Sequence, residues 1–137
     1  MSEERREGGC LCGAVRYSLP WPPRWLVTCS CSNCQKQSGS ALSVVGMIAR
    51  DDLALTGELA TYTDTADTGN AVFRRFCPRC GSPVLTDTDQ AREQGIIFFK
   101  AGTLDVTRDL EPATHMWTKS AQGWVAFPGH HEQLLEQ

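Results

Sequence analysis

The sequence lacks any long hydrophobic run. Across its 137 residues, no apolar stretch approaches the roughly 20 residues that a membrane-spanning helix needs. The charged N-terminal residues 1–9 also lack the apolar core of a secretion signal. We therefore expect a cytoplasmic protein with no membrane partner.

Basic charge is also scarce. The chain carries 13 Lys and Arg against 16 Asp and Glu, for a net charge of −3, and its basic residues are scattered. A nucleic-acid-binding domain shows a basic patch or stripe, so we expect no nucleic-acid partner. No internal repeat, low-complexity tract or linker is visible, and the length suits one domain. We expect a flexible lead-in at residues 1–7 and a single zinc-binding domain at residues 8–137.

Cysteine, in contrast, is abundant, with seven in the chain. In a reducing compartment, closely spaced cysteines indicate metal ligation rather than disulfide bonds. An odd number also rules out complete disulfide pairing within one chain. The positions of the seven thiols therefore guide the functional interpretation.

Three of these cysteines lie within six residues. Cys29 and Cys31 are two apart, so an extended backbone points both side chains to one face, and a turn can bring Cys34 to them. Three thiolates can occupy three corners of a zinc tetrahedron at ~2.3 Å. The segment from Cys29 to Gly39 contains no His, Asp or Glu as a fourth ligand. Open zinc sites with three protein ligands are typical of catalysis, so these three are the candidate catalytic residues.

The other four cysteines form two pairs. Cys10 and Cys12 fall in a stretch of alternating pattern, residues 10–17, which predicts a strand with both thiols on one face. Cys77 and Cys80 have the spacing of a zinc knuckle, and Gly81 suits the left-handed position after such a turn. A redox dithiol is less favoured because the surrounding βαβ pattern is missing.

Two divisions of the seven ligands are possible. In the first, Cys10, Cys12, Cys77 and Cys80 hold a structural zinc, and the remaining three hold an open catalytic zinc. In the second, Cys31 and Cys34 join the knuckle pair in one site, which leaves three cysteines unused. Two zinc ions per chain would support the first division, and one would support the second.

Short strands separated by turn signals predict a mainly β fold. Strands are expected at residues 10–17, 25–28, 41–49, 53–56, 59–62, 71–76, 83–86, 96–100 and 115–118. Few short helical turns are expected, at residues 33–37 with Ser32 as the cap and Gly39 as the end, within residues 87–95, and at residues 131–137.

A zinc ion with three thiolates carries a net negative charge, which suits binding and activating a thiol. We expect a cationic neighbour to offset this charge; the candidates are Lys36, Arg74, Arg75 and Lys100. His115 is expected to be a packed strand residue, His130 and His131 to be solvated, and Trp117 and Trp124 to belong to the core.

The ordered motifs resemble the glutathione-dependent formaldehyde-activating enzyme (GFA) family, which includes the centromere protein V-like domains. The matching segments are Gly9-Cys10-Leu11-Cys12-Gly13, Cys29-Ser30-Cys31-Ser32-Asn33-Cys34, Ser38-Gly39, Phe76-Cys77-Pro78-Arg79-Cys80-Gly81, Gly102-Thr103-Leu104-Asp105 and His115-Met116-Trp117. The chain departs from many members at Ser30, where they carry His, and at Gln35, where they carry Arg.

This resemblance implies a β-tent of packed antiparallel sheets stapled by zinc. It also implies the first division of ligands, with structural zinc on Cys10, Cys12, Cys77 and Cys80 and catalytic zinc on Cys29, Cys31 and Cys34. The implied activity is that of a carbon–sulfur lyase, which forms S-hydroxymethylglutathione from formaldehyde and glutathione or another small thiol. The alternatives are a non-enzymatic zinc-binding interaction module and a thiol or metal sensor.

Overall fold

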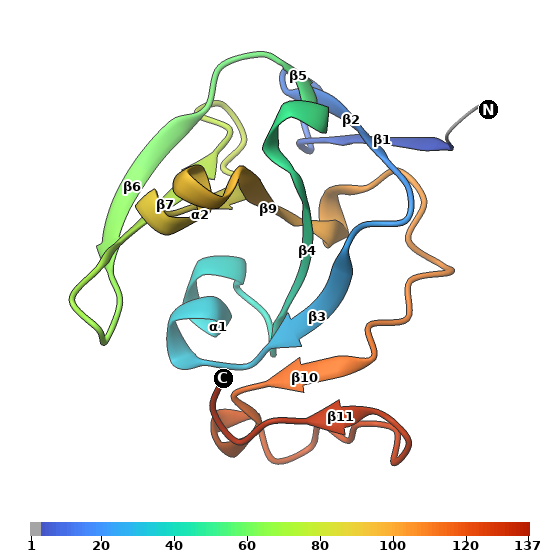
Figure 1. Cartoon of the computed structure of the whole chain (residues 1–137), viewed down its shortest axis with the longest axis vertical. Helices are drawn as coiled ribbons and strands as arrows, with labels where there is room; N and C mark the ends of the chain where they lie inside the picture. Colours follow the sequence, from blue (N-terminus) through green and yellow to red (C-terminus); the bar gives the residue numbers. More distant parts are fainter. Residues whose placement is uncertain (1–3) are drawn as a thin grey trace.

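The computed structural model describes residues 4–137 and contains two β-sheets with two short α-helices (Figure 1). The strands are β1 (Arg5–Gly9), β2 (Arg16–Pro20), β3 (Trp25–Cys29), β4 (Ser43–Ala49), β5 (Ala54–Thr56), β6 (Ala60–Thr65), β7 (Ala71–Phe76), β8 (Pro83–Asp87), β9 (Ile96–Lys100), β10 (Thr114–Met116) and β11 (Glu132–Gln133). The expected mainly β fold is confirmed.

The smaller sheet has the order β1-β2-β5 and is antiparallel throughout. Its first strand includes Arg5, Arg6 and Glu7, which were expected to lie in a flexible lead-in. These polar residues are ordered because each pairs with a residue of β2, from Arg5 opposite Pro20 to Gly9 opposite Arg16. The part of the expected lead-in at residues 1–3 lies outside the described residues.

The larger sheet has the order β11-β10-β3-β4-β9-β8-β7-β6. Five of its pairings are antiparallel, as expected, but β10 runs parallel to both β3 and β11. A parallel pairing needs a long crossover connection. Here the chain leaves β9, and a long non-repetitive segment, residues 104–113, carries it down one side of the molecule to the edge of β3 (Figure 1).

Side chains from both sheets meet in one hydrophobic core. Leu19 of the smaller sheet and Val84 and Phe99 of the larger one are fully buried in it. Gly46 lies opposite Phe99 in the β4–β9 register, and a Cβ atom at Gly46 would fall 2.3 Å from the Phe99 ring. Only glycine therefore fits at this position, and the phenyl ring packs directly on the backbone of β4.

The helices are short, as expected. Helix α1 (Ser32–Ser38) follows β3, and α2 (Asp89–Gln94) precedes β9; each ends at a left-handed glycine, Gly39 and Gly95. The prediction of a helical turn at residues 131–137 is wrong. This segment instead forms β11 at Glu132–Gln133, because its backbone pairs with β10 and hydrogen-bonds to Trp117 and Thr118. None of the helices described here has the length and apolar character needed to cross a bilayer.

A buried carboxylate lies at the end of β8 in the larger sheet. Asp87 is fully buried and accepts hydrogen bonds from Arg50, from Arg75 at 3.1 Å and from Arg92 at 3.3 Å. The backbone N–H of Thr88 donates a fourth, at 2.9 Å. Burial by itself would raise the pKa of Asp87, but the Arg50 hydrogen bond and the surrounding guanidinium charges hold it below its ordinary value.

We expect Asp87→Asn to lower the free energy of unfolding by about 3 kcal/mol, because it leaves three guanidinium groups without their shared buried partner. The lowered pKa predicts that this stabilisation is complete above about pH 4, the unfolded value, and is lost as pH falls through the folded value. Urea titrations between acid and neutral pH measure both effects. Asp89→Asn is the control, since this carboxylate is exposed and 3.9 Å from Arg92. Equal stability of the two variants would contradict the prediction.

Candidate metal centres

The first centre lies where turns from the two sheets meet. Cys10 and Cys12 come from the β1–β2 connection, and Cys77 and Cys80 come from the β7–β8 connection. Their four Sγ atoms all lie within 4.8 Å of one another. The centre therefore joins the N-terminal hairpin to the middle of the chain, two segments more than 60 residues apart.

Local structure presents Cys10 and Cys12 differently from the prediction. Residues 10–15 form a turn rather than the start of a strand, and β2 begins only at Arg16. Gly13 adopts a φ of +83°, a conformation that glycine reaches without a steric penalty. The turn lets the Val15 N–H donate to Cys10 Sγ at 3.2 Å. Both thiols face one site because the chain folds back, not because a strand alternates.

The sulfur spacing fits a zinc ion. Sulfurs bound at about 2.3 Å in a tetrahedron lie about 3.8 Å apart. Here Cys10 Sγ and Cys12 Sγ are 3.6 Å apart, and Cys12 Sγ and Cys77 Sγ are 3.8 Å apart. Four thiols form a closed donor set of the kind found in structural zinc sites.

Hydrogen bonds from Ser82 favour the thiolate form at Cys80. The Ser82 hydroxyl lies 3.3 Å from Cys80 Sγ, and hydrogen bonds from Ser82 lower the pKa of Cys80 to about 5. The same hydroxyl accepts the Leu11 N–H at 3.0 Å. Ser82 thus connects both halves of the four-cysteine centre, and the sequence motif alone did not identify this role.

The second centre lies where β3 passes into α1. Cys29 ends β3, Cys31 is the N-cap of α1, and Cys34 lies in its first turn. Their Sγ atoms lie within 4.8 Å of one another. Cys31, rather than the expected Ser32, caps the helix, because Cys31 Sγ accepts the Cys34 N–H at 3.2 Å. The cap and the ligand geometry are therefore set by the same side chain.

The three-cysteine centre has an open side. Within residues 4–137, this group includes no fourth Cys, His, Asp or Glu. A cavity of about 350 Å³ opens beside Cys31, with Arg74 and Trp117 in its wall. The donor set fits a zinc ion with one coordination position left for another molecule. The metal ions and the catalytic role of the three cysteines stay predictions.

Lys100 is the cation best placed to offset the charge of this centre. Ser43 lies directly opposite Cys29 in the β3–β4 register, and the buried Lys100 Nζ donates to Ser43 Oγ at 2.9 Å. Burial lowers the pKa of Lys100, whereas the charges of Cys34 and the other two thiolates oppose this shift. A buried ammonium group is stable only near compensating negative charge, which the three thiolates provide.

Arg74 is a second nearby cation. It is 8% exposed, lines the cavity with Cys31, and donates to Asp64 at 2.9 Å. The other two candidates are placed differently. Lys36 lies on the exposed face of α1, and Arg75 binds the Asp87 carboxylate. The structure therefore reduces the four candidates from the sequence to Lys100 and Arg74.

Gln35 braces the three-cysteine loop. Its side-chain amide donates to the Ser30 carbonyl at 2.7 Å and to the Ser120 carbonyl at 3.0 Å. Gln122 in turn donates to Gln35 Oε1 at 3.1 Å. Ser30 itself is fully buried. Gln35 therefore holds α1 against residues 117–122 through the backbone carbonyls of Ser30 and Ser120.

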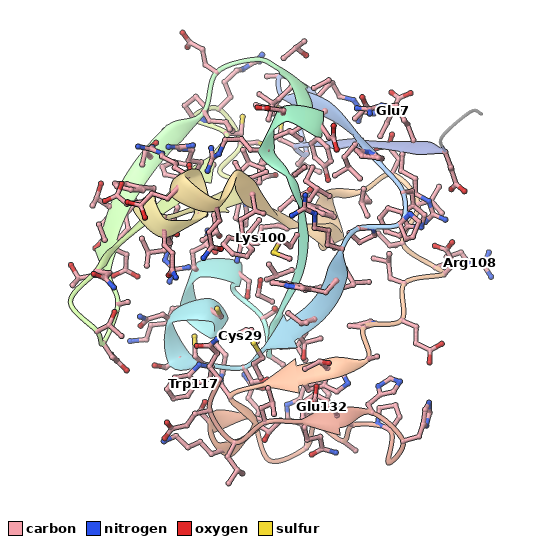
Figure 2. All side chains as sticks on the ribbon, viewed as in Figure 1. Glu7, Cys29, Lys100, Arg108, Trp117 and Glu132 are labelled. Atoms are coloured by element: carbon pink, nitrogen blue, oxygen red, sulfur yellow. The ribbon has the colours of Figure 1, made fainter. Side chains whose placement is uncertain are left out.

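Trp117 was expected in the core, and this prediction is wrong. The side chain is partly exposed and lines the cavity next to Cys31. Figure 2 labels it below α1, close to Cys29. Its φ of +58° is the left-handed conformation, which is strained for a bulky residue and is commonest at functional sites. Hydropathy could not separate this position from a core position. Trp124 is also exposed, at 76%, rather than in the core.

A family model and several known proteins are similar to this chain. A family model described as glutathione-dependent formaldehyde-activating enzyme matches residues 5–120. A protein of Halomonas elongata named "Putative glutathione-dependent formaldehyde-activating enzyme" is 28% identical over 131 residues, which cover 92% of this chain and 83% of that protein. A Podospora anserina protein of the same name is 37% identical over 78 residues, 53% of this chain but only 35% of its own length.

A crystal structure of a Rhodobacter sphaeroides protein shares the fold. The TM-score is 0.57 with 19% sequence identity, over 75% of this chain and 91% of that one. The family match spans both cysteine centres and most of both sheets. The chain therefore belongs to the glutathione-dependent formaldehyde-activating enzyme family.

Proposed function

We propose that this protein is a zinc-dependent carbon–sulfur lyase. It binds a small thiol of the glutathione type at the three-cysteine centre and forms or cleaves an S-hydroxymethyl adduct with formaldehyde or a related aldehyde. Family membership suggests glutathione-dependent formaldehyde activation. The open donor set of Cys29, Cys31 and Cys34 beside a cavity is the observation that carries the proposal.

The chemistry required is thiol activation. A zinc ion held by Cys29, Cys31 and Cys34 would lower the pKa of a thiol that completes its coordination, so that the thiol loses its proton. The four-cysteine centre, with no open position, would hold a second zinc in a structural role. The expected content is two zinc ions per chain.

The protein's own residues would provide the surroundings for this step. The buried ammonium group of Lys100 offsets negative charge of the three thiolates, and Arg74 does so from the cavity wall. Trp117 contributes to the wall of the same cavity. A reduced net charge at the centre favours the binding of one more thiolate, because like charges repel strongly where water is excluded.

The reaction itself is an addition. The substrate sulfur attacks the carbonyl carbon of the aldehyde and forms the carbon–sulfur bond. The electron pair of the carbonyl π bond moves to oxygen, and the proton lost by the thiol ends on that oxygen. The reverse reaction breaks the carbon–sulfur bond and returns free thiol and aldehyde. No oxidant or reductant is needed in either direction.

Exchange NMR with ¹³C-formaldehyde tests the proposal directly. The rate of interconversion between formaldehyde and its glutathione adduct is measured with and without protein of known zinc content. We expect the protein to accelerate this exchange. Cysteine and 2-mercaptoethanol, used in place of glutathione, would show whether the cavity selects the thiol.

An exchange rate that stays at the uncatalysed value with two zinc ions bound would contradict the lyase assignment. Thiol reactivity that rises on zinc removal, without aldehyde turnover, would favour the sensor alternative. Two tightly held ions with neither property would favour the interaction module. The three outcomes are distinct in one set of samples.

Lys100→Met provides a sharper test of the charge arrangement. Methionine keeps the length and apolar character of the lysine stem but removes the ammonium group. We expect kcat/KM for adduct formation to fall about tenfold, the usual loss when a group next to a metal centre is removed. Lys36→Met is the matched control on the exposed face of α1. Equal losses for the two variants, or none for Lys100→Met, would rule out this role for Lys100.

A further inference from the structure

A third group of metal-binding side chains lies apart from both cysteine centres. Glu111 belongs to the connection that precedes β10, and His130 and His131 precede β11. One carboxylate oxygen and one ring nitrogen from each histidine lie within 4.8 Å of one another. Glu111 Oε2 is 3.2 Å from His131 Nε2 and 3.8 Å from His130 Nε2.

His131 is not solvated, contrary to the prediction from sequence. Its side chain is 6% exposed, and its ring lies against the ring of His115, with centroids 5.1 Å apart and planes 29° from parallel. The ring of Phe127 packs on the ring of His115, with centroids 4.3 Å apart. His115 is the packed strand residue that was expected, but it also supports the position of His131.

A hydrogen-bonded chain fixes the orientation of the His131 ring. His131 Nδ1 lies 2.9 Å from His115 Nε2, and His115 Nδ1 lies 2.7 Å from Thr28 Oγ1. Histidines that bind metals almost always use their second ring nitrogen in such a hydrogen bond. The buried His115 and Thr28 therefore form the support that a metal-binding histidine needs, with His131 Nε2 directed outward at Glu111.

The distances fit a transition-metal ion. Nitrogen and oxygen ligands bound at about 2.0–2.1 Å lie about 2.9–3.4 Å apart in tetrahedral or octahedral geometry. The 3.2 Å separation of Glu111 and His131 falls in this range. His130 is 76% exposed, so a small side-chain movement can shorten its 3.8 Å separation from Glu111. When His131 donates from Nδ1 to His115, its Nε2 lone pair faces the carboxylate, and a cation between the two satisfies both.

We propose that Glu111, His130 and His131 form a third metal site, selective for divalent first-row transition ions such as Zn²⁺, Co²⁺ or Ni²⁺. Two imidazoles and one carboxylate are the donor set that such ions prefer. Water fills the remaining positions, since the site is at the surface. It contains no sulfur, so it differs chemically from both cysteine centres and does not depend on the proposed lyase activity.

Cobalt binding to protein that carries two zinc ions per chain, one for each cysteine centre, tests this site. We expect one Co²⁺ per chain beyond the zinc already bound, with visible d–d bands but without the near-ultraviolet charge-transfer band of cobalt–thiolate bonds. The ring-proton signals of His130 and His131 should broaden in the NMR spectrum. Glu111→Gln and His130→Gln, both at exposed positions, should each weaken Co²⁺ binding about tenfold or more.

Glu93→Gln is the control, because it removes an exposed carboxylate from α2 and should leave Co²⁺ affinity unchanged. Unchanged affinity in Glu111→Gln and His130→Gln would overturn the proposal, as would the absence of a third ion. A cobalt–thiolate band with loss of zinc would show exchange at the cysteine centres instead, and would also overturn it. Circular dichroism confirms that each variant remains folded.

Discussion

Replacing Cys34 with alanine is expected to leave the protein folded but lower its rate of adduct formation by more than about 100-fold. Loss of one of three thiolate ligands weakens metal binding more than the loss of a supporting residue, which already costs 10–100-fold. The fold should survive because the three cysteines lie within one short segment, Cys29 to Cys34, and do not join distant parts of the chain.

Metal analysis and exchange NMR on the same sample provide the measurement. The zinc content should fall from about two to about one per chain, in step with the loss of exchange. Lys36→Ala, on the exposed face of the same helix, should keep both properties. Full activity in a Cys34→Ala protein with one zinc would show that the three-cysteine centre is not the site of the chemistry.

Replacing Cys77 with serine, unlike replacing Cys34, is expected to cause loss of the folded state. Cys77 is fully buried, and its centre connects the β1–β2 turn with the β7–β8 turn. Binding of a structural zinc contributes on the order of 10–16 kcal/mol in small zinc domains, which equals or exceeds the 5–15 kcal/mol that is typical of net protein stability. Few domains of this size remain folded after losing a contribution of this size to their free energy of folding.

Thermal unfolding followed by circular dichroism measures this effect. We expect Cys77→Ser to lack a cooperative transition or to melt far below the wild type. Cys12→Ser changes a thiol of the same centre that is exposed rather than buried, and it should also destabilise, which separates ligand loss from the loss of core packing. A Cys77→Ser protein with wild-type stability would show that the four-cysteine centre does not hold the fold together.

Most strands could be predicted from sequence because each has a local signal. The apolar run Ile96–Lys100 became β9, and the knuckle at Cys77 and Cys80 connects two strands as expected. The turn at residues 10–15 was missed because alternating residues also occur in a turn that folds around a ligand group. The tail at residues 131–137 was missed because its conformation is set by pairing with β10.

The candidate site likewise had features that the sequence predicted and features that only the structure showed. The spacing of Cys29, Cys31 and Cys34 made a shared centre one of two possible divisions of the seven cysteines, and the structure groups these three together. The role of Lys100 was one of four possibilities, because its contact with Ser43 depends on the order of β3, β4 and β9. Trp117 had no local signal for a position in the cavity wall.

The sequence by itself determined the mainly β fold, the short-spaced cysteine motifs and the family, because these depend on residue types and short spacings. The tertiary structure decided how the cysteines divide into four and three, and it placed two of the four candidate cations, Lys100 and Arg74, near the open centre. It also brought Glu111 to His130 and His131. These relations join residues that are distant along the chain, and strand order and register fix them only when both sheets close on the shared core.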